Sequence, residues 1–174
     1  MSGFNGLLDA TFNPPRNWTL NESLVYNCDF LLEKEMKMLK DCKIDITPRT
    51  IIGGMIIVPK GYITDLASVP RAIWGLISPF DIARAAVVHD MLYEYINTRY
   101  KEVLESASAE NGPVSKRERE TYRKIADEIF KAAMYDSEPS VPVWKIYSAF
   151  WAVRAFGRWA INNSAPRKKI ETIL

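Results

Sequence analysis

Three polar residues on one predicted helix are of types that perform acid–base chemistry. His89 is the only histidine in the chain, Asp90 follows it, and Tyr93 lies one turn later. The surrounding apolar residues recur at helical spacing, so His89 and Tyr93 share a face while Asp90 lies at its edge. Histidine titrates near neutral pH and often acts as a general base. The pattern therefore predicts either a base at His89 or a core histidine that makes one hydrogen bond.

A later predicted helix supplies a carboxylate that suits this face. Asp127 lies among apolar residues in the stretch Ala126-Asp127-Glu128-Ile129-Phe130, so we expect it to be part-buried and to need a donor. If the two helices are antiparallel, His89 and Tyr93 are the donors. Asp127 would then hold the imidazole in one tautomer and leave its other nitrogen as the base. The same groups equally suit a hydrogen-bond network that fastens two helices together.

Two further carboxylates have the chemistry to bind a metal ion. Asp90 could bind a hard cation together with oxygen ligands from a nearby loop. Asp65 follows Thr64 at a predicted strand end, and it could reach the same place as a third carboxylate. An aspartate in that position commonly makes an Asx turn or caps the next helix, and we favour this structural role for Asp65.

Residues 81–93, with the later stretch 126–130, resemble the catalytic helix pair of phospholipase A2, above all its parvovirus-type members. In that family the histidine of an H-D-x-x-Y motif activates water, the next aspartate binds calcium, and the tyrosine and second-helix aspartate orient the histidine. The resemblance implies these roles, in order, for His89, Asp90, Tyr93 and Asp127, with calcium as the cofactor. The glycine-rich calcium loop of that family has no counterpart in residues 68–74.

A larger set of motifs resembles an uncharacterised phage-associated family, domain of unknown function 1353. The motifs are residues 58–71, 85–93 and 126–130, and the resemblance spans roughly residues 50–160. It implies a bacteriophage or prophage source and no established activity. Our first hypothesis is a virion structural or accessory protein, of the tail or head–tail region, that acts through protein–protein contacts. The alternative is a metal-assisted ester hydrolase with His89 as general base, and the sequence leaves open whether the chain is an enzyme.

The composition narrows the classes of protein. The chain has 23 basic and 21 acidic residues and a net charge of +2, which argues against a dedicated nucleic-acid-binding protein. Its two cysteines exclude a disulfide-rich scaffold. We see no signal peptide, and no apolar run reaches about 18 residues, so no transmembrane segment is expected. The expected location is the virion, after synthesis in the host cytoplasm.

The last predicted helix is rich in aromatic residues on more than one face. Core packing accounts for part of them, and the surplus, with Arg154 and Arg158 between, suits a protein interface. The expected partners are other virion proteins or copies of the chain itself, and a membrane surface ranks behind them. The aromatic residues are Trp144, Tyr147, Phe150, Trp151, Phe156 and Trp159.

The elements that must position these residues form one α+β domain. Alternating and then helical periodicity predict a small N-terminal antiparallel sheet followed by a bundle of three to four helices. Ser68, Asp81 and Ser115 are expected N-caps. The expected regions are an extended arm over 1–20, a domain over 21–162 with its sheet at 21–65 and helices at 68–162, a surface insertion at 98–114, and a basic tail at 163–174. The expected helices are 69–76, 81–96, 115–135 and 141–161.

Overall fold

A computed structural model of the chain describes residues 2–50, 52–66, 79–106 and 116–163. The strands in these residues form two antiparallel sheets, with orders β1-β4-β6-β5 and β2-β3-β7. The helices follow the strands along the chain, except for α1, so the expected α+β class with an N-terminal sheet is confirmed. The strands are β1 (Gly3–Asn5), β2 (Ala10–Asn13), β3 (Asn17–Leu20), β4 (Leu24–Leu32), β5 (Ile46–Pro48), β6 (Ile52–Val58) and β7 (Ile63–Thr64).

The central strand pair of the larger sheet carries the sheet side of the core. On β4, Leu24, Tyr26 and Cys28 alternate with more exposed residues, as a strand with one buried face requires. Tyr26 lies opposite Ile56 of β6, and both are fully buried. Because register shifts by one residue would turn these side chains outward, the apolar alternation sets the pairing.

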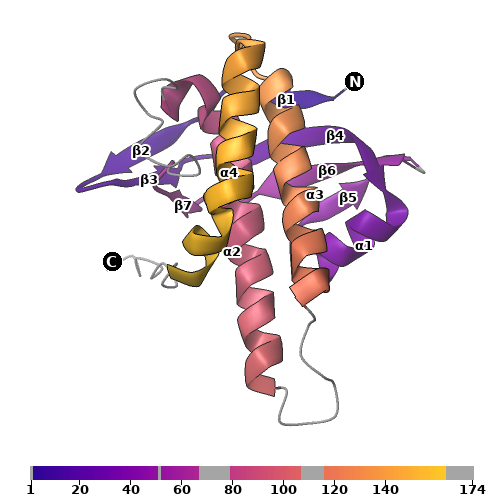
Figure 1. Cartoon of the computed structure of the whole chain (residues 1–174). Coiled ribbons are helices and arrows are strands. Elements are labelled where there is room, and N and C mark those ends of the chain that lie inside the picture. The colour runs from indigo at the N-terminus through magenta and orange to yellow at the C-terminus, as the bar shows by residue number, and fades with distance from the viewer. Residues whose placement is uncertain (1, 51, 67–78, 107–115, 164–174) are drawn as a thin grey trace.

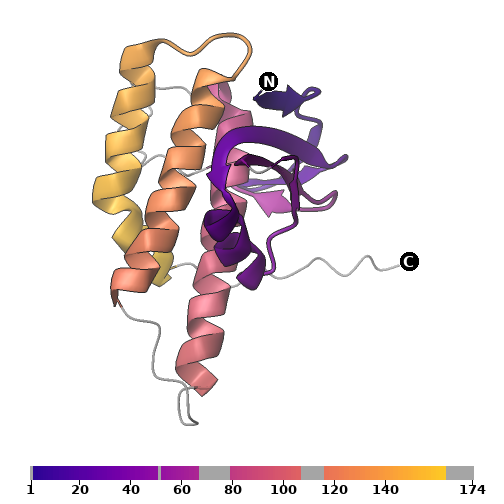
Figure 2. The ribbon, with the colours of Figure 1, turned by 90° about the vertical axis from the view of Figure 1, so that its right-hand side faces the viewer.

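Three long helices cover the sheets, as Figures 1 and 2 show. The helices α2, α3 and α4 lie roughly antiparallel to one another in sequence order, and α4 is the farthest from the strands in Figure 2. The buried apolar residues of the helices and strands form one core cluster. The helical elements are α1 (Glu33–Asp41), a 3-10 turn η2 (Pro79–Ile82), α2 (Ala83–Ser106), α3 (Lys116–Tyr135) and α4 (Val143–Asn163).

The expected arm over residues 1–20 is wrong, because residues 3–20 contain three paired strands. β1 pairs with β4, and β2 and β3 form a hairpin whose second strand pairs with β7. Ser2 donates a hydrogen bond to Asp136 at 3.0 Å, and Arg84 donates one to the carbonyl of Gly6 at 3.1 Å. The Asn- and Pro-rich composition therefore serves the hairpin turn rather than a free segment.

The sequence reading also missed α1. Its nine residues include Glu33 and Glu35 in the first turn and Lys40 in the last, which suits the helix dipole. Met36 and Leu39, three residues apart, are its buried residues. The Glu35 carboxylate also accepts a hydrogen bond from the Leu32 amide at 3.0 Å. The helix has only nine residues and follows directly on the apolar alternation of β4, so its helical spacing is difficult to recognise in the sequence.

The boundaries of α2 differ from the expectation at both ends. Its N-terminal residue is Ala83. Asp81, the expected cap, lies in η2, and its carboxylate binds the Lys145 ammonium at 2.6 Å. Its last residue is Ser106 rather than 96, so much of the expected surface insertion is helical. Tyr100 helps to hold this extension, since the Arg119 guanidinium of α3 stacks 4.2 Å from its ring.

The two later helices agree with the expectation. α3 over 116–135 and α4 over 143–163 lie within two residues of the expected bounds. Other expectations lie outside the described residues: the helix at 69–76, the caps at Ser68 and Ser115, the rest of the insertion, and the tail from residue 164. No helix in the described part of the chain is long and apolar enough to cross a membrane.

Candidate functional site: a buried polar network and an aromatic face

The structure brings His89, Tyr93 and Asp127 together, as the sequence predicts. His89 Nε2 lies 2.9 Å from Asp127 Oδ1, and the Tyr93 hydroxyl donates to the same oxygen at 2.6 Å. A carboxylate only accepts hydrogen bonds, so Nε2 carries the proton. His89 is 2% exposed and Asp127 is fully buried. The antiparallel packing of α2 on α3 makes this contact possible (Figure 1).

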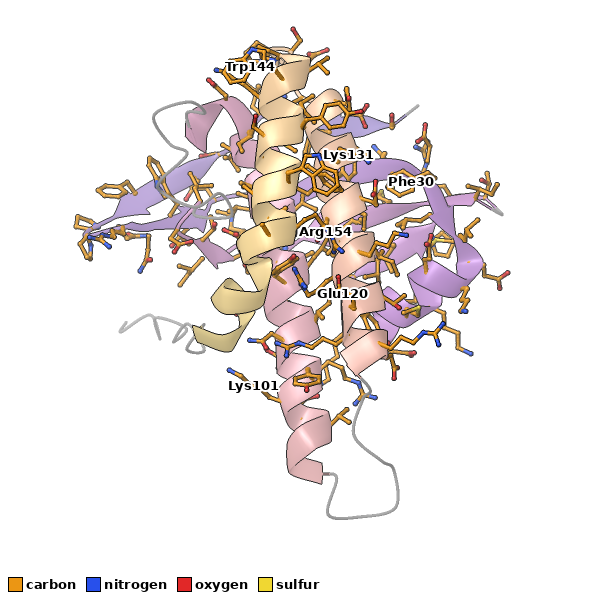
Figure 3. All side chains as sticks on the ribbon, in the orientation of Figure 1. Phe30, Lys101, Glu120, Lys131, Trp144 and Arg154 are labelled. Carbon is orange, nitrogen blue, oxygen red and sulfur yellow. The ribbon has the colours of Figure 1, made fainter. Side chains whose placement is uncertain are left out.

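A cationic side chain on α4 binds the second carboxylate oxygen of Asp127. Arg154 Nη1 donates to Asp127 Oδ2 at 2.9 Å, and its Nη2 donates to Glu120 Oε1 at 2.6 Å. Figure 3 shows Arg154 reaching from α4 toward Glu120 on α3. Arg123 Nη1 donates to the second Glu120 oxygen at 2.8 Å. These six residues, which we call the polar network, are His89, Tyr93, Glu120, Arg123, Asp127 and Arg154.

Hydrogen bonding and charge keep the polar network ionised. Burial alone would raise the pKa of Asp127, but hydrogen bonds from His89, Tyr93 and Arg154 outweigh it and hold that pKa below its ordinary value. Burial, followed by the Asp127 charge, raises the pKa of Tyr93, so its hydroxyl stays protonated. The two guanidinium groups of the network, Arg123 and Arg154, are paired with its two carboxylates, Glu120 and Asp127.

The imidazole of His89 is held on its faces as well as at Nε2. The ring centroid of Tyr93 lies 4.1 Å from that of His89, and the ring centroid of Phe130 lies 4.6 Å from it. Because Nε2–H is engaged with Asp127, Nδ1 is the nitrogen that a base would use. A side chain that is 2% exposed gives water little access to that atom. His89 and Asp127 are therefore oriented like a catalytic histidine–aspartate pair. They are also as buried as a pair that only stabilises the fold.

Asp90, one of the two expected metal ligands, is on α2 and is hydrogen-bonded to the end of β7. Asp90 Oδ2 accepts a hydrogen bond from the Thr64 hydroxyl at 2.6 Å. The Thr64 hydroxyl oxygen in turn accepts a hydrogen bond from the backbone amide of Leu66 at 3.0 Å. Asp65, half-buried, follows Thr64 directly. Among residues 2–50, 52–66, 79–106 and 116–163, no group of three His, Cys, Asp or Glu side chains is placed to hold a metal ion. The calcium site thus stays a prediction from the resemblance.

Sequence reasoning missed three members of the polar network. Glu120 and Arg123 are charged residues on α3 that resemble any solvated helix face in sequence, yet Arg123 is buried. Arg154 was expected at a partner interface, but its guanidinium binds Asp127 and Glu120 within the chain. One signal could have narrowed the choice: a buried carboxylate needs a cation, and α4 has only three, Lys145, Arg154 and Arg158.

The outward side of α4 carries large apolar residues. Trp144 and Trp151 are 55% and 64% exposed, although Phe150 between them is buried. Lys131 of α3 lies 4.6 Å from the Phe150 ring centroid, and Figure 3 shows Trp144 at the end of α4 away from Arg154. The side chains of Phe156 and Trp159 lie outside the described residues. We call the exposed group the aromatic face; it comprises Val143, Trp144, Tyr147 and Trp151 of α4 and Tyr135, the last residue of α3.

The structure can now be set beside known proteins. No curated protein and no solved structure matches the chain. The family model described as "Protein of unknown function (DUF1353)" matches residues 36–153, from within α1 to the middle of α4. The match includes every residue of the polar network except Arg154, which follows its last residue. This match covers more than half of the 174 residues. The chain therefore belongs to the DUF1353 family.

Proposed function

We propose that this chain is a bacteriophage virion protein, of the tail or head–tail region, that acts by binding other proteins through its aromatic face. The observation that carries the proposal is the exposure of Trp144 and Trp151 on one helix. Contiguous exposed apolar groups are unfavourable in water and commonly mark contact sites. Tryptophan is also enriched at the centres of protein interfaces. The phage setting rests on the resemblance to a phage-associated family.

The character of the polar network supports a structural role for its residues. Six side chains from three helices bind one another through hydrogen bonds and ion pairs, and His89 is enclosed among them. Such a network fixes the relative positions of α2, α3 and α4. A rigid bundle presents its outer helix in one orientation, which lowers the entropy cost of binding.

The charges beside the aromatic face favour a protein partner over an anionic surface. Lys145 binds Asp81 at 2.6 Å, and Arg154 binds Asp127 and Glu120. Two of the three cationic residues of α4 are therefore neutralised within the chain. A nucleic acid or an anionic membrane would gain little electrostatic attraction from them.

Mass spectrometry of purified particles of the encoding phage tests the proposal. We expect peptides of this chain at a fixed ratio to the major tail proteins after the particles have been banded and washed. A non-virion protein encoded by the same phage serves as the contamination control. Absence of the chain, or a level no higher than that of the control, would refute the virion proposal.

One observation favours a second candidate, an ester hydrolase. Asp127 Oδ1 accepts hydrogen bonds from both His89 Nε2 and the Tyr93 hydroxyl. Such an arrangement orients an imidazole so that its Nδ1 can take a proton from water. The test is hydrolysis of phospholipid vesicles and of a soluble ester, with and without calcium. The wild type is compared with His89→Gln, after circular dichroism has shown that the variant folds. Equal background rates for both proteins would exclude the hydrolase.

A further inference from the structure

Two exposed tryptophans of α4 lie seven residues apart on its outer side. Trp144 and Trp151 lie equally far from the point between Tyr147 and Ser148. All four lie on one side of the helix, since residues three, four and seven apart share a face. In an antiparallel two-fold contact centred at this point, Trp144 of each copy would lie opposite Trp151 of the other.

Ser148, beside the midpoint, is a small residue whose donor is satisfied. The Ser148 hydroxyl donates to the Trp144 carbonyl at 2.8 Å, so its donor is already used inside the helix. Ala155, one turn beyond Trp151, is exposed and small. Two helices that cross at Ser148 can therefore pack closely, and neither leaves a serine donor unpaired.

The electrostatics of the aromatic face favour a second copy as its occupant. A strongly charged partner would need opposite charge to attract it, and Lys145 and Arg154 are already bound in ion pairs. The same holds for Lys131 of α3, which binds Glu128 at 2.5 Å. Two copies of a surface that is apolar and locally neutral meet without like-charge repulsion.

The size of the aromatic face is adequate for the centre of a dimer contact. Its five side chains are each about half exposed. Large side chains of this kind have total areas of about 150–250 Å² each, so together they expose about 500 Å². A standard interface buries about 800 Å² per partner, with an apolar centre and a polar rim. The face supplies such a centre, and neighbouring residues of α3 and α4 supply the rim.

The position of α4 leaves room for the second copy. In Figures 1 and 2 it is the outermost helix, and its outer side is turned away from both sheets. A helix from another molecule can thus lie along it without displacing any described element. We infer that two copies of this chain associate through an antiparallel, two-fold contact of α4 with α4. Trp144 of one copy packs on Trp151 of the other, and the two Ser148 residues lie near the axis.

This inference rests on the proposed function, because it names the partner of the same aromatic face. Sedimentation velocity of the full chain over a range of concentrations tests it. We expect a concentration-dependent dimer that Trp151→Glu converts to monomer, with the Kd raised at least about 100-fold. Leu7→Glu, which places the same charge at an exposed apolar residue outside the face, should leave the dimer intact. A wild-type monomer at all concentrations, or a dimer that Trp151→Glu does not weaken, would overturn it.

Cysteine cross-linking tests the antiparallel geometry separately. Both native cysteines, Cys28 and Cys42, are buried, so new surface cysteines can be oxidised selectively. Ser148→Cys should form a disulfide between two copies, because residues on the axis meet their own equivalents. Trp144→Cys should not, since it lies about 5 Å along the helix from the axis and so about 10 Å from its equivalent in the other copy. Cross-linking of Trp144→Cys alone would contradict the antiparallel arrangement.

These tests fail separately from the test of the proposed function. A chain that sediments as a monomer but occurs in particles leaves the virion proposal in place and refutes the dimer. A chain that dimerises through α4 but is absent from particles refutes the virion proposal alone.

Discussion

The two sides of α4 invert the usual distribution of polar and apolar groups. On the inner side, Arg154 binds Asp127 and Glu120 in a network that includes a fully buried carboxylate. On the outer side, only three residues earlier in the chain, Trp151 is 64% exposed. Stability alone favours the opposite arrangement, since apolar burial is favourable and charge burial is costly.

The contrast separates two roles within one helix. The inner side orients α4 on α2 and α3, because the geometry of ion pairs and hydrogen bonds is more specific than that of apolar contacts. The outer side contributes little to folding, and we attribute its aromatic residues to binding. Changes on the inner side should therefore alter stability, and changes on the outer side should alter association.

The largest expected effect is on the inner side, from Asp127→Ala. The variant leaves His89 and Tyr93 without their shared hydrogen-bond acceptor and removes one of the two carboxylates that bind Arg154. We therefore expect the free energy of unfolding to fall by about 3–5 kcal/mol. Urea unfolding followed by circular dichroism measures it. The matched control is Asp81→Ala, which removes a carboxylate from the more exposed pair with Lys145 and should cost at most about 1 kcal/mol. Equal losses in the two variants would contradict a special role for the network.

Acid should weaken the inner side through the same carboxylate. The pKa of Asp127 is lowered in the folded chain from the ordinary value of 3.8, so its contribution to stability is complete above that value. The contribution is lost as the pH falls below 3.8 toward the folded pKa. The unfolding free energy of the wild type should therefore fall more steeply between about pH 4 and pH 2 than that of Asp127→Asn. Parallel pH profiles would show that Asp127 is not stabilised in its ionised form.

A smaller effect is expected from Tyr93→Phe. The change removes one hydrogen bond to Asp127 Oδ1 and keeps the ring that packs on His89, so the loss should be about 1.5 kcal/mol. His89 Nε2 and Arg154 still donate to the carboxylate. Chemical denaturation gives the value, and a loss as large as that of Asp127→Ala would mean that the network is not shared among several donors.

The smallest effect on folding is expected on the outer side. Trp151→Glu should change the unfolding free energy by no more than about 0.5 kcal/mol when wild type and variant are compared below the concentration at which they associate. Thermal unfolding of dilute protein measures it. A loss of several kcal/mol would place Trp151 in the fold rather than in a contact.

Periodicity was sufficient to predict the inner face of the helix pair. His89 and Tyr93 share a helical face, and Asp127 is surrounded by apolar residues, so their meeting follows from antiparallel packing. Periodicity did not identify Arg154 as the third partner of Asp127. Which charged residue turns inward depends on how α4 crosses α3, and that angle is set by contacts between distant parts of the chain.

The N-terminal region shows a different limit of sequence reasoning. The three-residue strand β1 has too few residues for an alternating pattern, and its pairing with β4 is visible only in the fold. Similarly, β7 continues the apolar stretch after β6 but pairs with β3 in the other sheet. Local patterns predict that a segment is extended, whereas its partner is chosen by long-range packing.

A competition for incorporation into virions tests the central claim most directly. Host cells that supply wild type, Trp151→Glu and Leu7→Glu in equal amounts would be infected with phage lacking the gene, and each form would be quantified in purified particles. We expect wild type and Leu7→Glu to be incorporated equally, and Trp151→Glu to be depleted at least about tenfold. Equal incorporation of all three would contradict the assignment of the outer side of α4 as the surface through which this protein acts.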